Sequence, residues 1–185
     1  MTHRNILGIC GSLRSQSYNR SALLAASELM PQGMQLRIAD YRQIPLYDQD
    51  LERAGMPSAV QQLAQDIRSA DALLIASPEY NFSISGVLKN AIDWLSRLQE
   101  QPLKNKPVAL MSATLGPVGG ARHQYEVRKI LGCLEALVMP RPEVFINLCQ
   151  PKFDADGRLV DAAARMAVAD QMQAFGSWTE RMLAP

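Results

Sequence analysis

Histidine and cysteine are scarce in this sequence of 185 residues. The two histidines are His3 and His123, and the three cysteines, Cys10, Cys133 and Cys149, lie far apart in the chain. Neither histidine has metal-ligand spacing to a cysteine, so we expect no structural zinc or other metal site. Cysteine catalysis is disfavoured as well, because the nucleophilic thiolate needs an imidazole partner. The dispersed, odd cysteines instead predict buried, reduced thiols and a cytoplasmic protein.

The sequence also lacks an excess of charge and a long apolar run. Its 19 Lys and Arg are balanced by 18 Asp and Glu, which argues against nucleic-acid binding, since that needs a basic surface. Strongly acidic electron carriers are disfavoured in the same way. No apolar run approaches the ~20 residues needed to cross a bilayer, and the start of the chain lacks the pattern of a signal peptide. We therefore expect neither a nucleic-acid nor a membrane partner.

What the sequence does contain is enough apolar residues for a core and a regular alternation of strand and helix patterns. Hydrophobic residues make up 48% of the chain, and no composition break marks a boundary, so residues 1–185 are expected to form a single domain. Apolar patterns predict strands at 5–10, 35–39, 72–76, 107–112 and 143–147. Helices are predicted at 19–30, 58–68, 87–98, 122–134 and 159–183. This alternation implies an α/β fold with a five-stranded parallel sheet and helices on both faces.

The loops after the first, third and fourth strands form the candidate site, because ligands bind beyond the carboxyl ends of such strands. The first loop runs from Gly11 to Asn19 and opens a helix, where free N–H groups and the helix dipole favour an anion. Ser12, Ser17 and Asn19 can donate hydrogen bonds, and Arg14 can add a charge-assisted one. This set suits a terminal phosphate without a metal. The alternative is an ordinary polar turn with an asparagine N-cap.

Two known nucleotide-binding motifs are missing from this loop. It has no Gly-Lys-Ser/Thr and so is not a Walker loop. Gly8 and Gly11 are followed by Arg14 in place of a third glycine, and Asp40 falls too late to be the ribose-binding acid. A tightly bound dinucleotide is therefore disfavoured.

The other two loops carry groups that suit a flat aromatic heterocycle. Residues 77–86 bring two aromatic rings, Tyr80 and Phe82, and polar backbone directly after a predicted central strand. Residues 114–120 include three glycines, whose N–H groups can face developing negative charge. Either loop alone could be a surface turn. With the first loop, they predict a pocket that takes a phosphate at one end and a heterocycle at the other.

Three groups of motifs span these loops: Gly-Ser-Leu-Arg at 11–14, Pro-Glu-Tyr-Asn at 78–81 with Leu-Lys-Asn-Ala-Ile-Asp-Trp at 88–94, and Gly-Gly-Ala-Arg at 119–122. Together they resemble the NADPH-dependent FMN reductase family of the flavodoxin-like superfamily, and its bacterial quinone, chromate and azo-dye reductases in particular. The resemblance spans the whole chain. It implies a flavodoxin-like three-layer α/β/α sandwich with strand order 2-1-3-4-5.

The resemblance also implies roles for individual residues. The residues that would hold the FMN phosphate are Ser12, Arg14, Ser17, Tyr18 and Asn19. Those that would line the flavin are Pro78, Glu79, Tyr80 and Asn81, with Ser112 and Gly116 on the opposite side. Members are usually homodimers or homotetramers, and the residues that match their contacts between dimers are Arg122, Tyr125 and Glu143. From the pattern alone, these three belong to a solvated helix face and a lone surface acid.

The implied activity is FMN-dependent oxidoreduction with NAD(P)H as co-substrate. In this ping-pong scheme NAD(P)H delivers hydride to bound FMN and leaves, and a quinone, azo compound or chromate then takes the electrons. The flavin carries the chemistry, so no side chain is assigned as catalytic. The alternatives are a flavodoxin-type electron carrier and a reductase that releases reduced FMN to another enzyme. A redox-sensing interaction partner is a further alternative, for which the sequence offers no dedicated surface.

Overall fold

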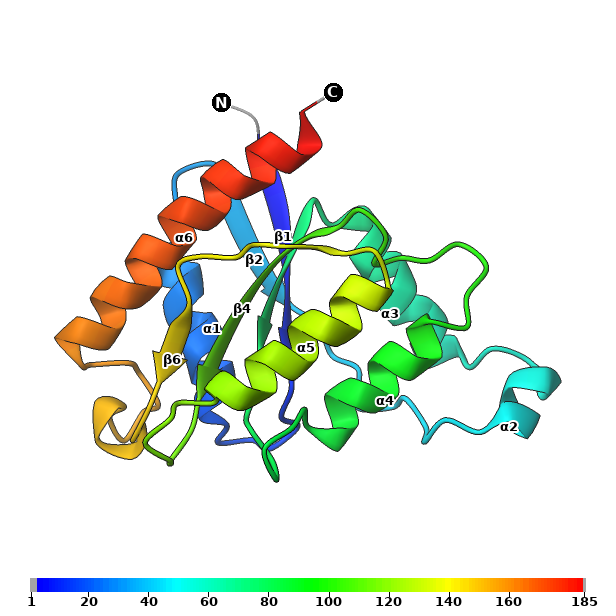
Figure 1. Ribbon diagram of the computed structural model, residues 1–185, viewed down its shortest axis with the longest axis horizontal. Coiled ribbons are helices and arrows are strands. Elements are labelled where there is room, and N and C mark those ends of the chain that lie inside the picture. Colours follow the sequence, from blue (N-terminus) through cyan, green and yellow to red (C-terminus); the bar gives the residue numbers. More distant parts are fainter. Residues whose placement is uncertain (1–2, 185) are drawn as a thin grey trace.

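The computed structural model describes residues 3–184, which form a parallel sheet covered by helices (Figure 1). The strands are β1 (Arg4–Cys10), β2 (Met34–Ile38), β3 (Ala72–Ala76), β4 (Pro107–Ala113), β5 (Leu137–Val138) and β6 (Val144–Ile146). They pair in the order β2-β1-β3-β4-β5, with β6 also on β4, and every pairing is parallel. The predicted α/β fold and its strand order are confirmed.

The helices lie in two layers, one on each face of the sheet (Figure 1). They are α1 (Tyr18–Glu28), α2 (Gln49–Ala54), α3 (Ser58–Ser69), α4 (Gly86–Leu95), α5 (Ala121–Cys133) and α6 (Ala162–Leu183), with a 3-10 turn at Gln150–Lys152. Successive strand residues point to opposite faces. Ile6 therefore packs in the core with α1 and α6, whereas Leu7 packs in the core with α3, α4 and α5. The result is the predicted three-layer sandwich.

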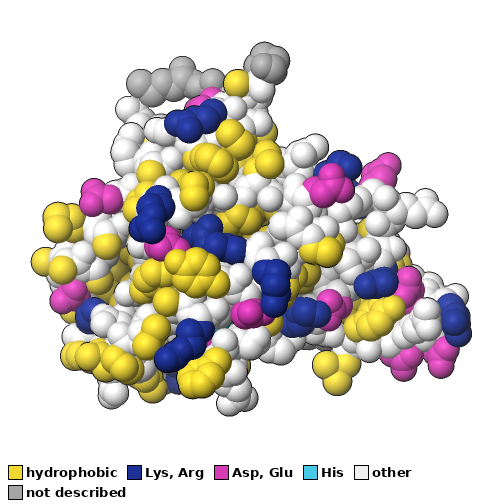
Figure 2. All heavy atoms as spheres, viewed as in Figure 1, with side chains coloured by type: hydrophobic (Ala, Val, Ile, Leu, Met, Phe, Trp, Pro, Cys, Tyr) yellow, Lys and Arg dark blue, Asp and Glu magenta, His cyan; other side chains and the backbone are white. Residues whose placement is uncertain are grey.

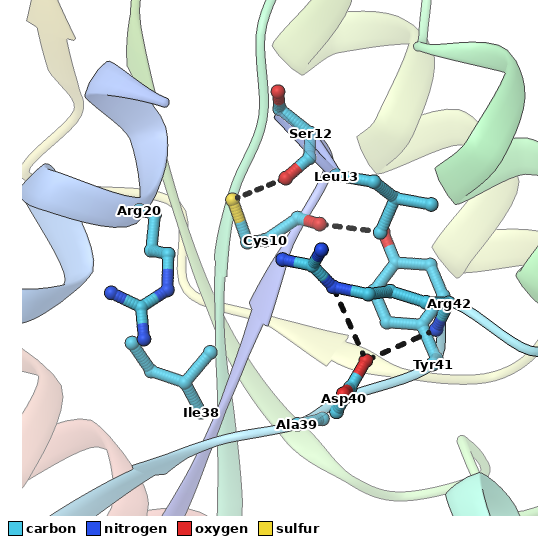
Figure 3. A pocket seen from close by; sticks show the side chains of 9 residues that line it. All are labelled: Cys10, Ser12, Leu13, Arg20, Ile38, Ala39, Asp40, Tyr41 and Arg42. Carbon is cyan, nitrogen blue, oxygen red and sulfur yellow. Dashed lines mark hydrogen bonds and ion pairs between the residues drawn. The ribbon is translucent and has the colours of Figure 1, made fainter. Parts of the chain in front are cut away.

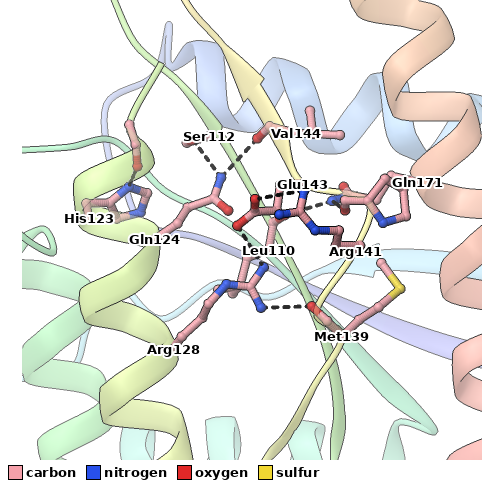
Figure 4. Close-up of polar contacts among 12 residues, drawn as sticks. Leu110, Ser112, His123, Gln124, Arg128, Met139, Arg141, Glu143, Val144 and Gln171 are labelled. Carbon is pink, nitrogen blue, oxygen red and sulfur yellow. Dashed lines mark hydrogen bonds and ion pairs between the residues drawn. The ribbon is translucent and has the colours of Figure 1, made fainter. Parts of the chain in front are cut away.

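The last position of the sheet departs from the prediction of a single strand at 143–147. β5 pairs with Pro107 and Val108 of β4, and β6 pairs with its other end, so two short strands share this position. Side chains replace the hydrogen bonds missing between them. Gln171 Nε2 donates to Leu110 O and Pro142 O, both at 2.9 Å. Gln124 Nε2 donates to Val144 O at 2.9 Å (Figure 4).

Three smaller predictions were wrong. The helix α2 was missed, because it carries no buried residue and so has no apolar stripe in the sequence; it stands away from the sheet in Figure 1. Ser17, not Asn19, is the N-cap of α1, since its Oγ accepts from Arg20 N. Cys133 is exposed at the end of α5, whereas Cys10 and Cys149 are buried as predicted.

Within residues 3–184, no helix is both long enough and apolar enough to span a bilayer. On the face shown in Figure 2, cationic and anionic side chains are interspersed and no large area has one sign. This distribution agrees with the nearly balanced charge of the sequence.

Candidate cofactor-binding site

A pocket of about 440 Å³ lies at the carboxyl ends of the strands, where the loops after β1, β3 and β4 meet. This size lies within the range of small-molecule and cofactor sites. Its wall includes most of the predicted site residues: Ser12, Arg14, Ser17, Tyr18, Asn19, Pro78, Glu79, Tyr80 and Gly116. The other three are Ala113, Thr114 and Leu115. The last two belong to the third predicted loop, but none of the three was given a role of its own.

The first loop presents hydrogen-bond donors to one end of the pocket. Ser17 occupies the N-cap of α1, so the next two backbone N–H groups, of Tyr18 and Asn19, precede the first helical hydrogen bond, Ser21 N to Ser17 O. Within residues 3–184, neither N–H has an acceptor, and Arg14 has no carboxylate partner. Free amides at a helix start and an unpaired guanidinium favour an anion here.

The Asn19 side chain is bonded to the sheet as well as lining the pocket. It is 3% exposed and is bonded twice to Ala113 of β4. Its Nδ2 donates to Ala113 O, and its Oδ1 accepts from Ala113 N, both at 2.9 Å. One hydrogen of Nδ2 and the oxygen Oδ1 are therefore bonded to the sheet, and Asn19 fastens the first loop to β4. Its backbone N–H and the second hydrogen of its Nδ2 remain for a ligand.

Aromatic contacts support the phosphate end of the pocket from one side. The Tyr18 ring lies 5.2 Å from the Phe153 ring, centroid to centroid, at an angle of 35°. The Arg14 guanidinium lies 5.7 Å from the centroid of the Tyr18 ring. This contact holds the Arg14 side chain at the pocket wall by a cation–π interaction.

The second loop forms a tight hairpin. Tyr80 and Ser83 exchange two backbone hydrogen bonds, of 3.1 and 2.9 Å. Asn81 and Phe82 at the tip have φ angles of 50° and 66°, the pattern of a type I′ turn. Tyr80 reaches the pocket, whereas Asn81 at the exposed tip is not among its lining residues. Asn81 was predicted to line the flavin, but its side chain is not part of the pocket wall.

Close packing joins the second loop to the first. Ser85 Oγ donates to Gly11 O at 2.6 Å. A Cβ on Gly11 would lie 2.1 Å from Ser77 Oγ, so only glycine allows this approach. The two loops thus act as one wall.

Glu79 connects the same loop to the start of α5. Its Oε2 accepts from His123 N at 3.2 Å, and its Oε1 lies 3.3 Å from Arg122 Nη1. The Arg122 guanidinium lies 4.3 Å from the centroid of the Phe82 ring. The N-cap residue of α5, Gly120, brings no side chain to this helix start, so Glu79 caps it from another loop.

The third loop closes the pocket on the far side. Thr114, Leu115 and Gly116 line it, but Ser112 does not. Ser112 is fully buried; its hydroxyl donates to Gly119 O at 2.6 Å and accepts from Gln124 Nε2 at 2.7 Å. It therefore supports the loop from behind, where Figure 4 shows it beside Gln124.

His123 is held at the base of this loop. It is 1% exposed, and its Nδ1 lies 2.8 Å from Gly120 O. Burial lowers the pKa of His123, against the opposing effects of the Gly120 hydrogen bond and Glu79. The imidazole is therefore neutral near pH 7 and donates from Nδ1, which leaves it tied to the loop.

The sequence matches the NADPH-dependent FMN reductase family over residues 4–150. An NAD(P)H-dependent FMN reductase of Pseudomonas aeruginosa is 50% identical over 177 residues, with 96% of each chain covered. This chain belongs to the NADPH-dependent FMN reductase family. A quinone reductase of Escherichia coli is 41% identical over 180 residues, again with 96% of each chain covered. The flavoenzyme NAD(P)H:(acceptor) oxidoreductase FerB of Paracoccus denitrificans superposes with a TM-score of 0.88 at 30% identity, covering 97% of this chain and 98% of FerB.

This family member is thus an oxidoreductase of a group that uses FMN and NAD(P)H, and its pocket fits FMN. The end with two free amides and an unpaired arginine suits the phosphate. Within residues 3–184, the Ser12 hydroxyl also has no partner and remains available to the same group. The wall of Pro78, Tyr80 and Leu115 suits the heterocycle.

The reductase has a second, smaller pocket on the other side of Ser12 (Figure 3). It measures about 130 Å³, which is below the usual range for a cofactor. Cys10 lies in its wall, and burial raises the pKa of this thiol despite the nearby Arg20 and Arg42. The Cys10 Sγ donates to Ser12 O at 3.2 Å. The thiol is therefore protonated and unreactive at neutral pH.

The three predicted interface residues lie on the α5 side of the reductase. Arg122 is bonded to Glu79 within the chain, and Tyr125 is exposed on the same helix. Glu143 is 11% exposed and lies between Arg128, at 3.8 Å, and Arg141, at 3.7 Å (Figure 4). Two of the three are thus paired within the chain, and Glu143 is not the lone surface acid that the pattern indicated.

Proposed function

We propose that this protein is an FMN-dependent NAD(P)H oxidoreductase that reduces quinones or similar acceptors, such as azo compounds or chromate. The observation that carries the proposal is the pocket formed by the three loops, which has an anion-binding end and an aromatic and apolar wall. Its relatives support the choice of acceptor, since the names of several include quinone reductase. Bound FMN would supply the hydride chemistry.

The protein's own residues would hold and shield the cofactor. The phosphate would bind the N–H groups of Tyr18 and Asn19, the Ser12 and Ser17 hydroxyls and the Arg14 guanidinium. Pro78 and Tyr80 would lie against the flavin on one side, and the loop at Gly116 on the other. No side chain need act as acid or base in this scheme, and Glu79 is already bonded to α5.

The proposal covers the chain as a whole. Residues 1–185 would form one FMN-binding domain, which agrees with a single path of strand pairing through the described residues. We further propose a homo-oligomer, dimer or tetramer, with Arg122, Tyr125 and Glu143 as candidate contacts. Two buried, unpaired cysteines suit a reducing compartment such as the cytoplasm.

Purified protein provides the first test. We expect a yellow protein with the visible absorbance of oxidised flavin, which keeps the flavin through gel filtration. Release of the flavin on the column would instead support a reductase that supplies free reduced FMN. A colourless protein that also fails to take up added FMN would overturn the cofactor and the proposed function.

Steady-state kinetics provide the second test. With NAD(P)H and benzoquinone varied together, alternating use of one site predicts parallel lines in the double-reciprocal plot. Intersecting lines would show that both substrates bind at once and would contradict the ping-pong scheme.

A further inference from the structure

The start of α5 is a positive end aimed at the loops that form the pocket. α5 begins directly after the third loop, at the same edge of the sheet (Figure 1). A helix N-terminus carries about half a positive charge, and Arg122 in the first turn adds a full one. Because Gly120 caps the helix without a side chain, nothing in the preceding loop offsets this charge.

Glu79 offsets it from across the pocket wall. Its carboxylate accepts from His123 N and pairs with Arg122, so one anion meets both sources of positive charge. The local sum is then about +0.5, and without the carboxylate it would be about +1.5. His123 contributes no charge, since it is buried and tied to Gly120 O.

The charge of Glu79 would act on a cofactor held in the pocket. Glu79 lines the pocket, and its side chain is 12% exposed, so water screens its charge less than at the surface. The remaining pocket charge, Arg14, lies in the loop that would hold the phosphate. Glu79 belongs to the second loop and Arg122 follows the third, so this pair lies beside the two loops between which the heterocycle would lie.

We propose that Glu79 sets the reduction potential of the bound flavin, by offsetting Arg122 and the N-terminus of α5. A flavin gains negative charge on reduction, so uncompensated positive charge nearby favours the reduced form. Glu79 is a tuning residue that acts through α5, and it also keeps the Tyr80–Ser83 hairpin attached to that helix through Arg122 and Phe82. The inference rests on the proposed function, since it needs FMN in the pocket.

The test is the midpoint potential of the FMN-loaded protein, measured by spectroelectrochemical titration. Glu79→Gln keeps an oxygen for His123 N but removes the charge, and we expect the equilibrium to shift about tenfold toward reduced flavin, or about +30 mV for a two-electron couple. Arg122→Gln should shift it in the opposite direction. The double variant should return close to the parent value.

Asp93→Asn provides a matched control. It removes one carboxylate from the Lys89–Asp93 ion pair, which is more exposed and does not line the pocket. We expect its midpoint potential to equal that of the parent protein. An equal shift in Asp93→Asn and Glu79→Gln would overturn the inference, because any lost carboxylate would then have the same effect.

Amide hydrogen exchange of the apoprotein adds a readout without flavin. We expect the His123 N–H to exchange faster in Glu79→Ala, which loses the acceptor, than in Glu79→Gln, which keeps it. Unchanged potentials in Glu79→Gln and Arg122→Gln with normal FMN uptake would overturn the inference alone, as would shifts of the same sign. Failure of the parent protein to bind FMN would overturn the proposed function, and this inference with it.

Discussion

At the scale of single residues, Asn19 shows how one side chain can support a site through its bonds to the protein. Its amide bonds both backbone groups of Ala113, the buried last residue of β4. We expect Asn19→Ala to lower the free energy of unfolding of the apoprotein by about 2–4 kcal/mol, because two buried backbone groups lose their partners. Urea denaturation without FMN measures this.

Ser12→Ala is the control for that prediction. The Ser12 hydroxyl has no partner within residues 3–184, so its loss should change apoprotein stability by no more than about 0.5 kcal/mol while weakening FMN binding. Equal stability of the two apoproteins would contradict the structural role of Asn19 and favour its predicted role as a phosphate ligand.

His123 predicts a pH dependence of stability. Burial lowers its pKa in the folded protein, whereas an unfolded histidine titrates near 6.5. Below about pH 6.5 the unfolded chain therefore binds a proton that the folded chain excludes, and stability falls with pH by up to about 1.4 kcal/mol per unit. The fall ends once the pH passes the lowered, folded pKa.

His123→Asn isolates this contribution. Asparagine can still donate to Gly120 O but does not titrate, so we expect the parent's stability advantage over the variant to be smaller at pH 5.5 than at pH 7.5. Denaturation curves at both pH values give the comparison. Parallel pH profiles for the two proteins would show that His123 is not the group responsible.

The residue scale also shows where sequence reasoning ends. The pattern of hydroxyls and Arg14 in the first loop correctly placed that loop at the pocket. However, Asn19 is bonded to a residue 94 positions away, and Glu79 to one 44 positions away. No local pattern encodes such partners, so the sequence could place both residues at the pocket but could not show that each is also bonded to a distant part of the chain.

At the scale of elements, prediction succeeded where burial imposes a pattern. Strands β3 and β4 are buried at every residue, and such strands read as continuous apolar runs. They were predicted to within one residue. By contrast, β5 has two residues and α2 buries none. Neither element therefore produces a periodic pattern of apolar residues in the sequence.

Gln171 tests how the divided edge of the sheet is held together. Its Nε2 donates to Leu110 O in β4 and to Pro142 O in the segment that joins β5 to β6. We expect Gln171→Leu to destabilise the protein by about 2 kcal/mol, since one buried and one half-buried carbonyl lose their donor. Gln173→Leu, on the exposed side of the same helix, should stay within about 0.5 kcal/mol. Equal losses in thermal denaturation would contradict the bridging role.

At the scale of the whole molecule, the pocket exists only when the chain is folded. Its walls come from three loops that the sheet brings to one edge, and Ser85, Asn19 and Glu79 join those loops to one another or to the elements behind them. A ligand of this pocket therefore binds the folded state and not the unfolded one. Binding must then stabilise all the elements that carry the loops, in proportion to its affinity.

Thermal denaturation with two flavins uses this coupling to test the phosphate end of the pocket. At a free FMN concentration of about 100 times Kd, stability should rise by about 2.7 kcal/mol, which is about 5–10 °C in Tm for a chain of this size. Riboflavin at the same concentration lacks the group that Arg14 and the amides of Tyr18 and Asn19 would bind, so its shift should be smaller. Arg14→Ala should reduce the FMN shift and leave the riboflavin shift unchanged. Equal shifts for both flavins in the parent protein would show that the first loop does not bind the phosphate.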